Sequence, residues 1–174
     1  GHRLTRVAEV LGRQWVFQVQ ETGSAPLRHF GTLLMAAASA LFAAAEQRAN
    51  ADAVAVDGKA LIAALNVAVD VATLIGISGR APMRFFRPSM CGALGAAAGI
   101  AHLHGADEEL LRRALGLTYS HLSGTMQAHV EGSPTLALQV ALNARAALSC
   151  WELARNGFPA PREMLEGPFG YLPL

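Results

Sequence analysis

Apolar side chains recur every three or four residues along most of the chain, which is the spacing of one face of an α-helix. Alternating apolar and polar positions, as in a half-buried strand, are scarce. The pattern predicts five helical segments: 31–48, 58–76, 92–104, 108–117 and 134–155. No repeat or flexible linker divides residues 1–174, so we expect one all-α domain, a compact helical bundle.

Several helix ends are marked by capping residues. Asp57 and Asp107 precede two of the segments, and an aspartate there accepts a hydrogen bond from the first helical turn. In the last segment a serine stands before Pro134, and proline is favoured at the first helical position. An asparagine followed by Gly157 supplies the left-handed stop, and prolines just after it prevent the helix from continuing.

The composition narrows the class of protein. Hydrophobic residues make up 52% of the chain and charged residues 16%, which excludes intrinsic disorder. The formal charge of +1, with arginines scattered along the chain, argues against nucleic-acid binding. Helices this rich in alanine and glycine approach one another closely. Because charged residues are sparse, we expect a second chain or a second lobe to cover part of the surface.

The apolar stretches do not predict a membrane protein. Each long charge-free stretch is interrupted by histidine, glycine or proline, or consists mainly of alanine, as at 36–45. No basic segment precedes a short apolar one at the start, so no secretory signal is expected. The two cysteines, Cys91 and Cys150, are expected to be buried thiols in a reducing cytoplasm.

Polar residues that a simple bundle would not require occur in three turns. A polar segment at 18–22 leads to His29, near the start of a helix, where the helix dipole disfavours the charged imidazole and suits acid/base work. A capping or core histidine is the alternative. Arg84 and Arg87 precede the next helix and are suited to hold a carboxylate or phosphate, or else belong to a solvated loop with aromatic anchors.

The third turn, 120–133, contains His121, His129 and Glu131. No helical HxxxH or HxxE pair is present, so a metal site is not predicted. No glycine-rich phosphate loop follows a strand, so a nucleotide cofactor is not predicted either. We expect His29, Arg87 and His121 to line one shared cavity where the three turns meet.

The order of these motifs resembles that of a known family. Residues 86–98 (FRPSMCGALGAAA) resemble the FHPT-x-x-CG-x-x-GAAAAA segment of the MmgE/PrpD family, which includes 2-methylcitrate dehydratase, cis-aconitate decarboxylase and iminodisuccinate epimerase. Other segments that are similar to family motifs follow the same order: 21–29, 58–76, 114–117, 120–124, 131–133 and 157–171. The resemblance covers nearly the whole chain.

This resemblance implies a helical domain, a separate α/β lid without a counterpart here, and a dimer. It implies a metal-independent, cofactor-free cytoplasmic lyase that dehydrates or decarboxylates small polycarboxylates. His29 then serves as acid/base and Thr22 as a positioning hydroxyl. Arg84 or Arg87 holds the carboxylate, and His121 is a second proton carrier.

Departures from the family pattern leave other functions open. Gln18 stands in place of an aspartate and Arg87 in place of a histidine, and an arginine is no general base at ordinary pH. Leu136, Gln139 and Ala141 replace a lysine, a histidine and a glycine. One alternative is a non-catalytic or split module, completed by a homodimer partner or by a lid-bearing chain. A helical scaffold unrelated to the family is the other.

Overall fold

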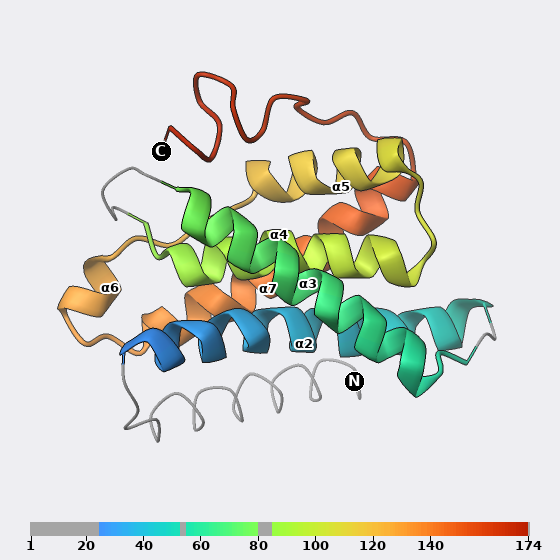
Figure 1. Ribbon diagram of the computed structural model, residues 1–174, viewed down its shortest axis with the longest axis horizontal. Coiled ribbons are helices and arrows are strands. Elements are labelled where there is room, and N and C mark those ends of the chain that lie inside the picture. The colour runs from blue at the N-terminus through green and yellow to red at the C-terminus, as the bar shows by residue number, and fades with distance from the viewer. Residues whose placement is uncertain (1–24, 53–54, 80–84, 174) are drawn as a thin grey trace.

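The computed structural model describes residues 25–52, 55–79 and 85–173, and these residues form an all-α bundle (Figure 1). The helices are α2 (Ala25–Asp52), α3 (Gly58–Ser78), α4 (Arg87–Leu103), α5 (Glu108–Ser120), α6 (Gln127–Val130) and α7 (Thr135–Arg155). Within the described residues the β-structure is one isolated bridge, between Phe85 and Thr125. The predicted all-α fold is confirmed.

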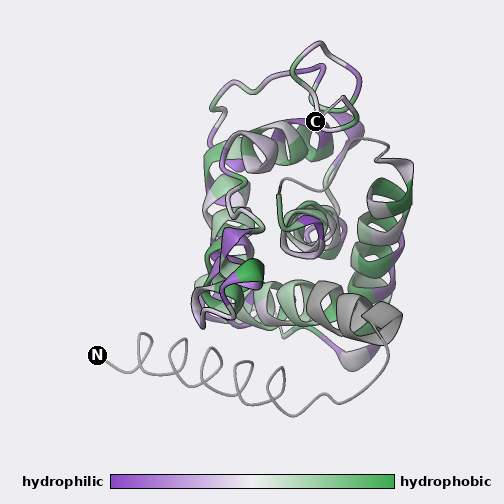
Figure 2. Ribbon diagram, turned by 90° about the vertical axis from the view of Figure 1, so that its left-hand side faces the viewer, coloured by the Kyte–Doolittle hydropathy of each residue, from purple (hydrophilic) through white to green (hydrophobic). Residues whose placement is uncertain are grey.

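Helix α4 is the centre of the bundle. Figure 2 looks along this helix and shows the others arranged around it. It packs against α2, α3, α5 and α7, and fourteen of its 17 residues are buried. A helix that is apolar on all sides is stable in water only when it is enclosed in this way.

Glycine and alanine allow α3 and α4 to approach closely. A Cβ added to Gly95 would lie 2.2 Å from the carbonyl oxygen of Ala68, and one added to Gly99 would lie 2.7 Å from that of Ala64. Both distances are shorter than any real contact, so only glycine fits at these two positions. The close packing predicted from composition is therefore present at this helix pair.

The predicted caps at Asp57, Asp107 and Gly157 are confirmed, whereas Pro134, predicted as the first helical residue, is the N-cap of α7, which begins at Thr135. The Asp57 side chain accepts a hydrogen bond from the Ala60 amide at 2.7 Å, and the Asp107 side chain accepts one from the Leu110 amide at 2.8 Å. After α7, Gly157 has a φ of +84°, the left-handed conformation expected there.

Helices α4 and α2 differ most from their predicted bounds, α5 extends three residues beyond its predicted end, and α6 was not predicted. The second predicted polar turn was expected to precede a helix starting at residue 92, but α4 already begins at Arg87. Pro88 is tolerated there because the first-turn amides have no partner within the helix. Residues 87–89 are therefore the first turn of α4 and not a loop. Helix α2 extends the predicted 31–48 segment at both ends.

Three helices run in one direction along the bundle, and two run in the opposite direction. Helices α2, α4 and α7 begin on the left of the molecule in Figure 1, whereas α3 ends on the left and α5 ends near the middle. Each helix N-terminus carries a partial positive charge and each C-terminus a partial negative one. The left end thus holds the N-termini of α2, α4 and α7 together with the C-terminus of α3, whose partial charge opposes theirs.

By length and composition, α3 could cross a membrane, and it is the one such helix among the described residues. Its small side chains Ala64, Ala68 and Ala72 are fully buried against the bundle. Most of the apolar residues that make α3 long enough to span a membrane lie on its other faces and are not buried.

Candidate functional site

The structure describes only some of the predicted site residues. Thr22 and Arg84 lie outside the described residues, and His29 is described only by its position in the first turns of α2. Arg87 is the first residue of α4, and His121 follows the last residue of α5 as its C-cap. Helices α2 and α4 both begin on the left of Figure 1, and the segment after α5 is bonded to the residue before Arg87.

Two of the three predicted polar turns are joined directly. The Phe86 amide donates to the Gly124 carbonyl at 3.1 Å, next to the bridge between Phe85 and Thr125. Gly124 has a φ of +107°, a conformation that disfavours any other residue. The start of α4 is therefore fixed against the segment that follows α5.

A buried asparagine holds this junction together. The amide nitrogen of Asn143, fully buried on α7, donates to the Ser89 hydroxyl at 2.7 Å and to the Ser123 carbonyl at 2.9 Å. Its amide oxygen accepts from the Ser123 amide at 3.2 Å. Sequence reasoning missed Asn143, although an asparagine inside an apolar helix pattern is a signal for a buried polar contact.

Arg87 has a structural contact of its own. Its Nη1 donates to the Gly79 carbonyl at 2.9 Å, at the C-terminal end of α3. A guanidinium has five N–H donors in a planar fork, so this contact does not by itself prevent Arg87 from holding an anion. The side chain is half-buried, and it is close enough to Cys91 to favour the thiolate.

Next to Arg87, a buried thiol faces a buried phenol. The Sγ of Cys91 lies 2.8 Å from the Oη of Tyr171, which belongs to the turns after α7. Burial raises the pKa of the Cys91 thiol, and the contacts with Tyr171 and Arg87 offset this only in part. Burial also raises the pKa of Tyr171. Both groups are therefore neutral at physiological pH, and the thiol is a poor nucleophile. Both cysteines are buried and free, as predicted.

The third predicted turn is more open. His121, His129 and Glu131 are exposed, and Gln127 Nε2 donates to Glu131 Oε1 at 2.5 Å. Across the described segments, no group of three or more His, Cys, Asp or Glu residues is placed to hold a metal ion. Gln139 donates from its side-chain amide to the Thr125 carbonyl at 3.4 Å.

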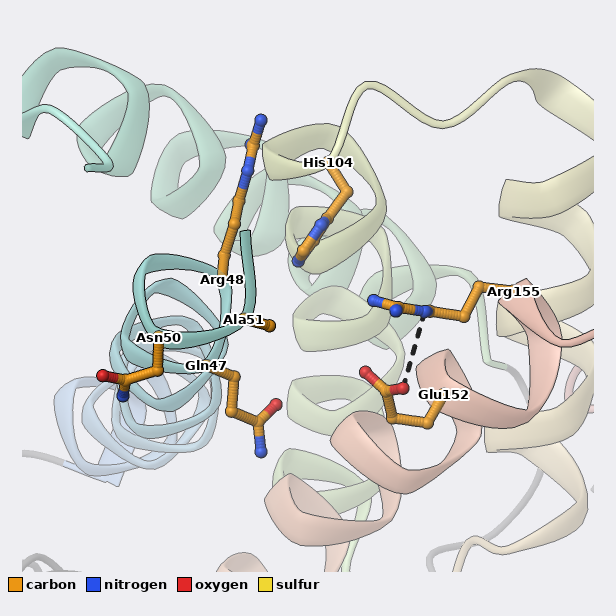
Figure 3. A pocket seen from close by; sticks show the side chains of 7 residues that line it. All are labelled: Gln47, Arg48, Asn50, Ala51, His104, Glu152 and Arg155. Carbon is orange, nitrogen blue, oxygen red and sulfur yellow. Dashed lines mark ion pairs between the residues drawn. The ribbon is translucent and has the colours of Figure 1, made fainter. Parts of the chain in front are cut away.

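A surface pocket of about 290 Å³ lies at the other end of the bundle (Figure 3). Its lining residues come from the C-terminal ends of α2, α4 and α7: Gln47, Arg48, Asn50, Ala51, His104, Glu152 and Arg155. None of the predicted site residues lines it. Arg48 donates to the Leu103 carbonyl, and Arg155 Nε pairs with Glu152 Oε2 at 3.5 Å. Cations at helix C-termini balance the dipole there, which is a structural role.

The family model for the MmgE/PrpD N-terminal domain matches residues 32–174. The match includes Arg84, Arg87 and His121, whereas Thr22 and His29 lie before its first residue. No curated protein matches the chain.

Proposed function

The chain belongs to the MmgE/PrpD family, and we propose that it supplies the helical part of a lyase site for small polycarboxylates. The substrates would be acids such as 2-methylcitrate or cis-aconitate, and the reaction a dehydration or decarboxylation that needs no metal. The observation that carries this proposal is the fixed position of Arg87 at the start of α4, next to a residue that is bonded to the segment after α5. The guanidinium of Arg87 belongs to the first turn of α4, where the partial positive charge of the helix N-terminus adds to its attraction for anions.

Such a reaction needs two kinds of group. A cation must hold the carboxylate, and a base must take a proton from the carbon next to it. In our proposal Arg87, together with Arg84, holds the carboxylate through charge-assisted hydrogen bonds. His29 is the acid/base, and its position in the first turns of α2 favours the neutral imidazole. Thr22 orients the substrate, and His121 is a second proton carrier.

The fixed junction between the start of α4 and the segment after α5 supports this arrangement. Arg87 is adjacent to Phe86, whose amide is bonded to Gly124, and His121 lies three residues before that glycine. A guanidinium that is already oriented loses less entropy when it binds a carboxylate. We therefore expect binding of the carboxylate to depend on the charge of Arg87.

One observation favours a second function, that of a non-catalytic or split module. Leu136 occupies the position of a family lysine, and its side chain packs against the hydrophobic core. A leucine in the core cannot hold a carboxylate, so one cation of the family pattern is missing. In this case the site is completed by a second chain, either a homodimer partner or a lid-bearing protein. We expect the isolated chain to show little or no turnover.

Calorimetric titration with cis-aconitate and 2-methylcitrate tests the proposal. We expect the parent chain to bind at least one of them, and Arg87→Ala to weaken binding about tenfold or more, because a charge-assisted contact contributes about 1.5–3 kcal/mol. Arg145→Ala is the matched control, since Arg145 is exposed on α7. No binding by the parent, or equal losses in both variants, would overturn the proposal. Circular dichroism checks that Arg87→Ala keeps its helices.

Turnover assays separate the two functions. Robust activity of the isolated chain that is lost in His29→Ala would establish a complete enzyme and contradict the split-module alternative. Activity that appears only after a lid-bearing polypeptide is added would establish the split enzyme. Binding without turnover under both conditions would leave the non-catalytic module as the function.

A further inference from the structure

The surface pocket at the C-terminal ends of α2, α4 and α7 is separate from the proposed lyase site (Figure 3). Its volume of about 290 Å³ is close to the lower limit of small-molecule sites, about 300 Å³. Among the residues that the structure describes, none that is proposed for the lyase site lines this pocket. A ligand of the pocket is therefore a small molecule, and it binds away from the proposed chemistry.

The charged side chains of this pocket do not all face its interior. Figure 3 shows the Arg155 guanidinium and the Glu152 carboxylate directed inward from α7, with the Gln47 side chain facing them from α2. Arg48 extends away from them and donates to the Leu103 carbonyl. The permanent charges that face the pocket are therefore one cation and one anion, and both come from the same helix.

One wall of the pocket is a ring that is already held in place. The His104 imidazole, at the C-cap of α4, packs on the Trp151 ring with 4.9 Å between the ring centroids. Trp151 itself is buried. The Ala51 side chain adds a small apolar surface to the lining. A wall that is formed before the ligand arrives lowers the entropic cost of binding.

The ion pair in the pocket is weak and accessible to water. Arg155 Nε lies 3.5 Å from Glu152 Oε2, and the two side chains are 43% and 48% exposed. An exposed pair of this kind contributes little to stability, so a ligand that takes over both partners loses little. Because the two partners lie one turn apart on one helix, the charges of such a ligand must also be adjacent.

The surroundings favour a ligand that carries both charges. Three helices end at this pocket, and their C-terminal carbonyl groups carry partial negative charge. Together with Glu152, they disfavour a simple anion, and Arg155 disfavours a simple cation. An α-amino acid carries an ammonium and a carboxylate on one carbon, so its charges match the two adjacent partners.

We propose that this pocket binds a free α-amino acid in its zwitterionic form. The ligand carboxylate accepts hydrogen bonds from the terminal nitrogens of Arg155, and the ligand ammonium donates to the Glu152 carboxylate. The side chain of the amino acid occupies the space lined by Ala51, His104 and Gln47. The site stands on this pocket alone and does not rest on the proposed lyase activity.

An amide NMR titration of the whole chain with L-glutamine tests this site. We expect shifts at the amides around the pocket, such as those of Gln47, Ala51 and His104, and a dissociation constant of about 1 mM for so small a ligand. N-acetyl-L-glutamine keeps only the carboxylate and L-glutaminamide only the ammonium, so each should bind about fivefold more weakly. Absence of shifts at about 20 mM L-glutamine would overturn the proposal, as would equal binding of either derivative.

Two variants remove one partner each. Glu152→Gln should weaken binding of L-glutamine about fivefold but not that of N-acetyl-L-glutamine, whereas Arg155→Gln should weaken binding of L-glutamine but not that of L-glutaminamide. Both side chains are largely exposed, so folding is preserved, and circular dichroism confirms it.

Arg145→Gln is the matched control, because it removes an exposed charge elsewhere on α7 and should leave all three dissociation constants unchanged. An equal loss in this control would show that binding follows the net charge of the chain and would contradict the site. Tighter binding of succinate than of L-glutamine would show that the pocket takes simple anions instead, which would also overturn the proposal.

Discussion

The side-chain amide of Asn143 donates to the hydroxyl of Ser89 at 2.7 Å across 54 residues of sequence. Both residues are fully buried. The contact ties α7 to the first turn of α4, and the same asparagine also holds Ser123 in the segment after α5. One side chain thus fastens three parts of the chain at the end of the bundle where the proposed site lies.

Replacing Asn143 by alanine should destabilise the fold by about 2–4 kcal/mol, because the substitution leaves the buried Ser89 hydroxyl and Ser123 carbonyl without their partner. Urea unfolding followed by circular dichroism measures the change. Gln47→Ala removes an exposed amide from α2 and should change the free energy of unfolding by less than about 0.5 kcal/mol. Equal losses in the two variants would show that Asn143 does not fasten the bundle.

Gly95→Ala tests the close approach of α3 and α4. The added methyl group would lie 2.2 Å from the Ala68 carbonyl oxygen and 2.7 Å from the Ala72 Cβ. Because one of these atoms belongs to the backbone, the helices must move apart, and we expect a loss of about 1–3 kcal/mol in thermal or urea unfolding.

Gly58→Ala is the matched control for that substitution. A Cβ at Gly58, the first residue of α3, meets no atom within 4 Å. Alanine is the better helix former, so this variant should be neutral or slightly more stable. If Gly95→Ala behaved in the same way, the two helices would not be in close contact in solution.

Local features of the fold could be predicted from the sequence. Asp57 and Asp107 cap their helices through bonds to residues three positions away, and such bonds are visible in local sequence. The start of α4 was predicted wrongly because Pro88 and the polar residues around it resemble a loop. Proline fits the first turn of a helix equally well, and only the packing of α4 decides between the two.

The candidate site could be predicted less completely, because its contacts join distant parts of the chain. The turn containing Arg87 and the turn containing His121 were predicted as polar segments, but the bond between Phe86 and Gly124 was not. The pairing of Cys91 with Tyr171, 80 residues apart, was also missed. No local pattern specifies such a pairing, which follows from how α4 packs against the C-terminal turns.

Tyr171→Phe should destabilise the chain by about 0.5–1.5 kcal/mol, since it removes a buried hydrogen-bonding partner of Cys91. Tyr119→Phe provides the comparison. The Tyr119 hydroxyl donates to the Phe169 carbonyl at an exposed position, where water replaces the lost contact, so a smaller loss is expected. Thermal unfolding of both variants shows which substitution lowers the stability more. A larger effect at Tyr119 would mean that the buried pair contributes little.

Stability should fall in alkaline solution, and Cys91 should contribute to the fall. Burial raises the pKa of this thiol above its ordinary value of 9.0. Above pH 9 the unfolded chain releases the proton while the folded chain keeps it, so rising pH favours unfolding. The slope reaches at most about 1.4 kcal/mol per pH unit for one group. Below pH 9 the thiol is neutral in both states and contributes no slope.

Urea unfolding between pH 8 and 10.5 should show a shallower fall for Cys91→Ser, which keeps a hydroxyl opposite Tyr171 but does not titrate. Cys150, Tyr171 and Tyr119, whose pKa values are also raised by burial, contribute to the slope that remains in that variant. If the parent and Cys91→Ser lost stability in parallel, the Cys91 thiol would be open to solvent in the folded chain.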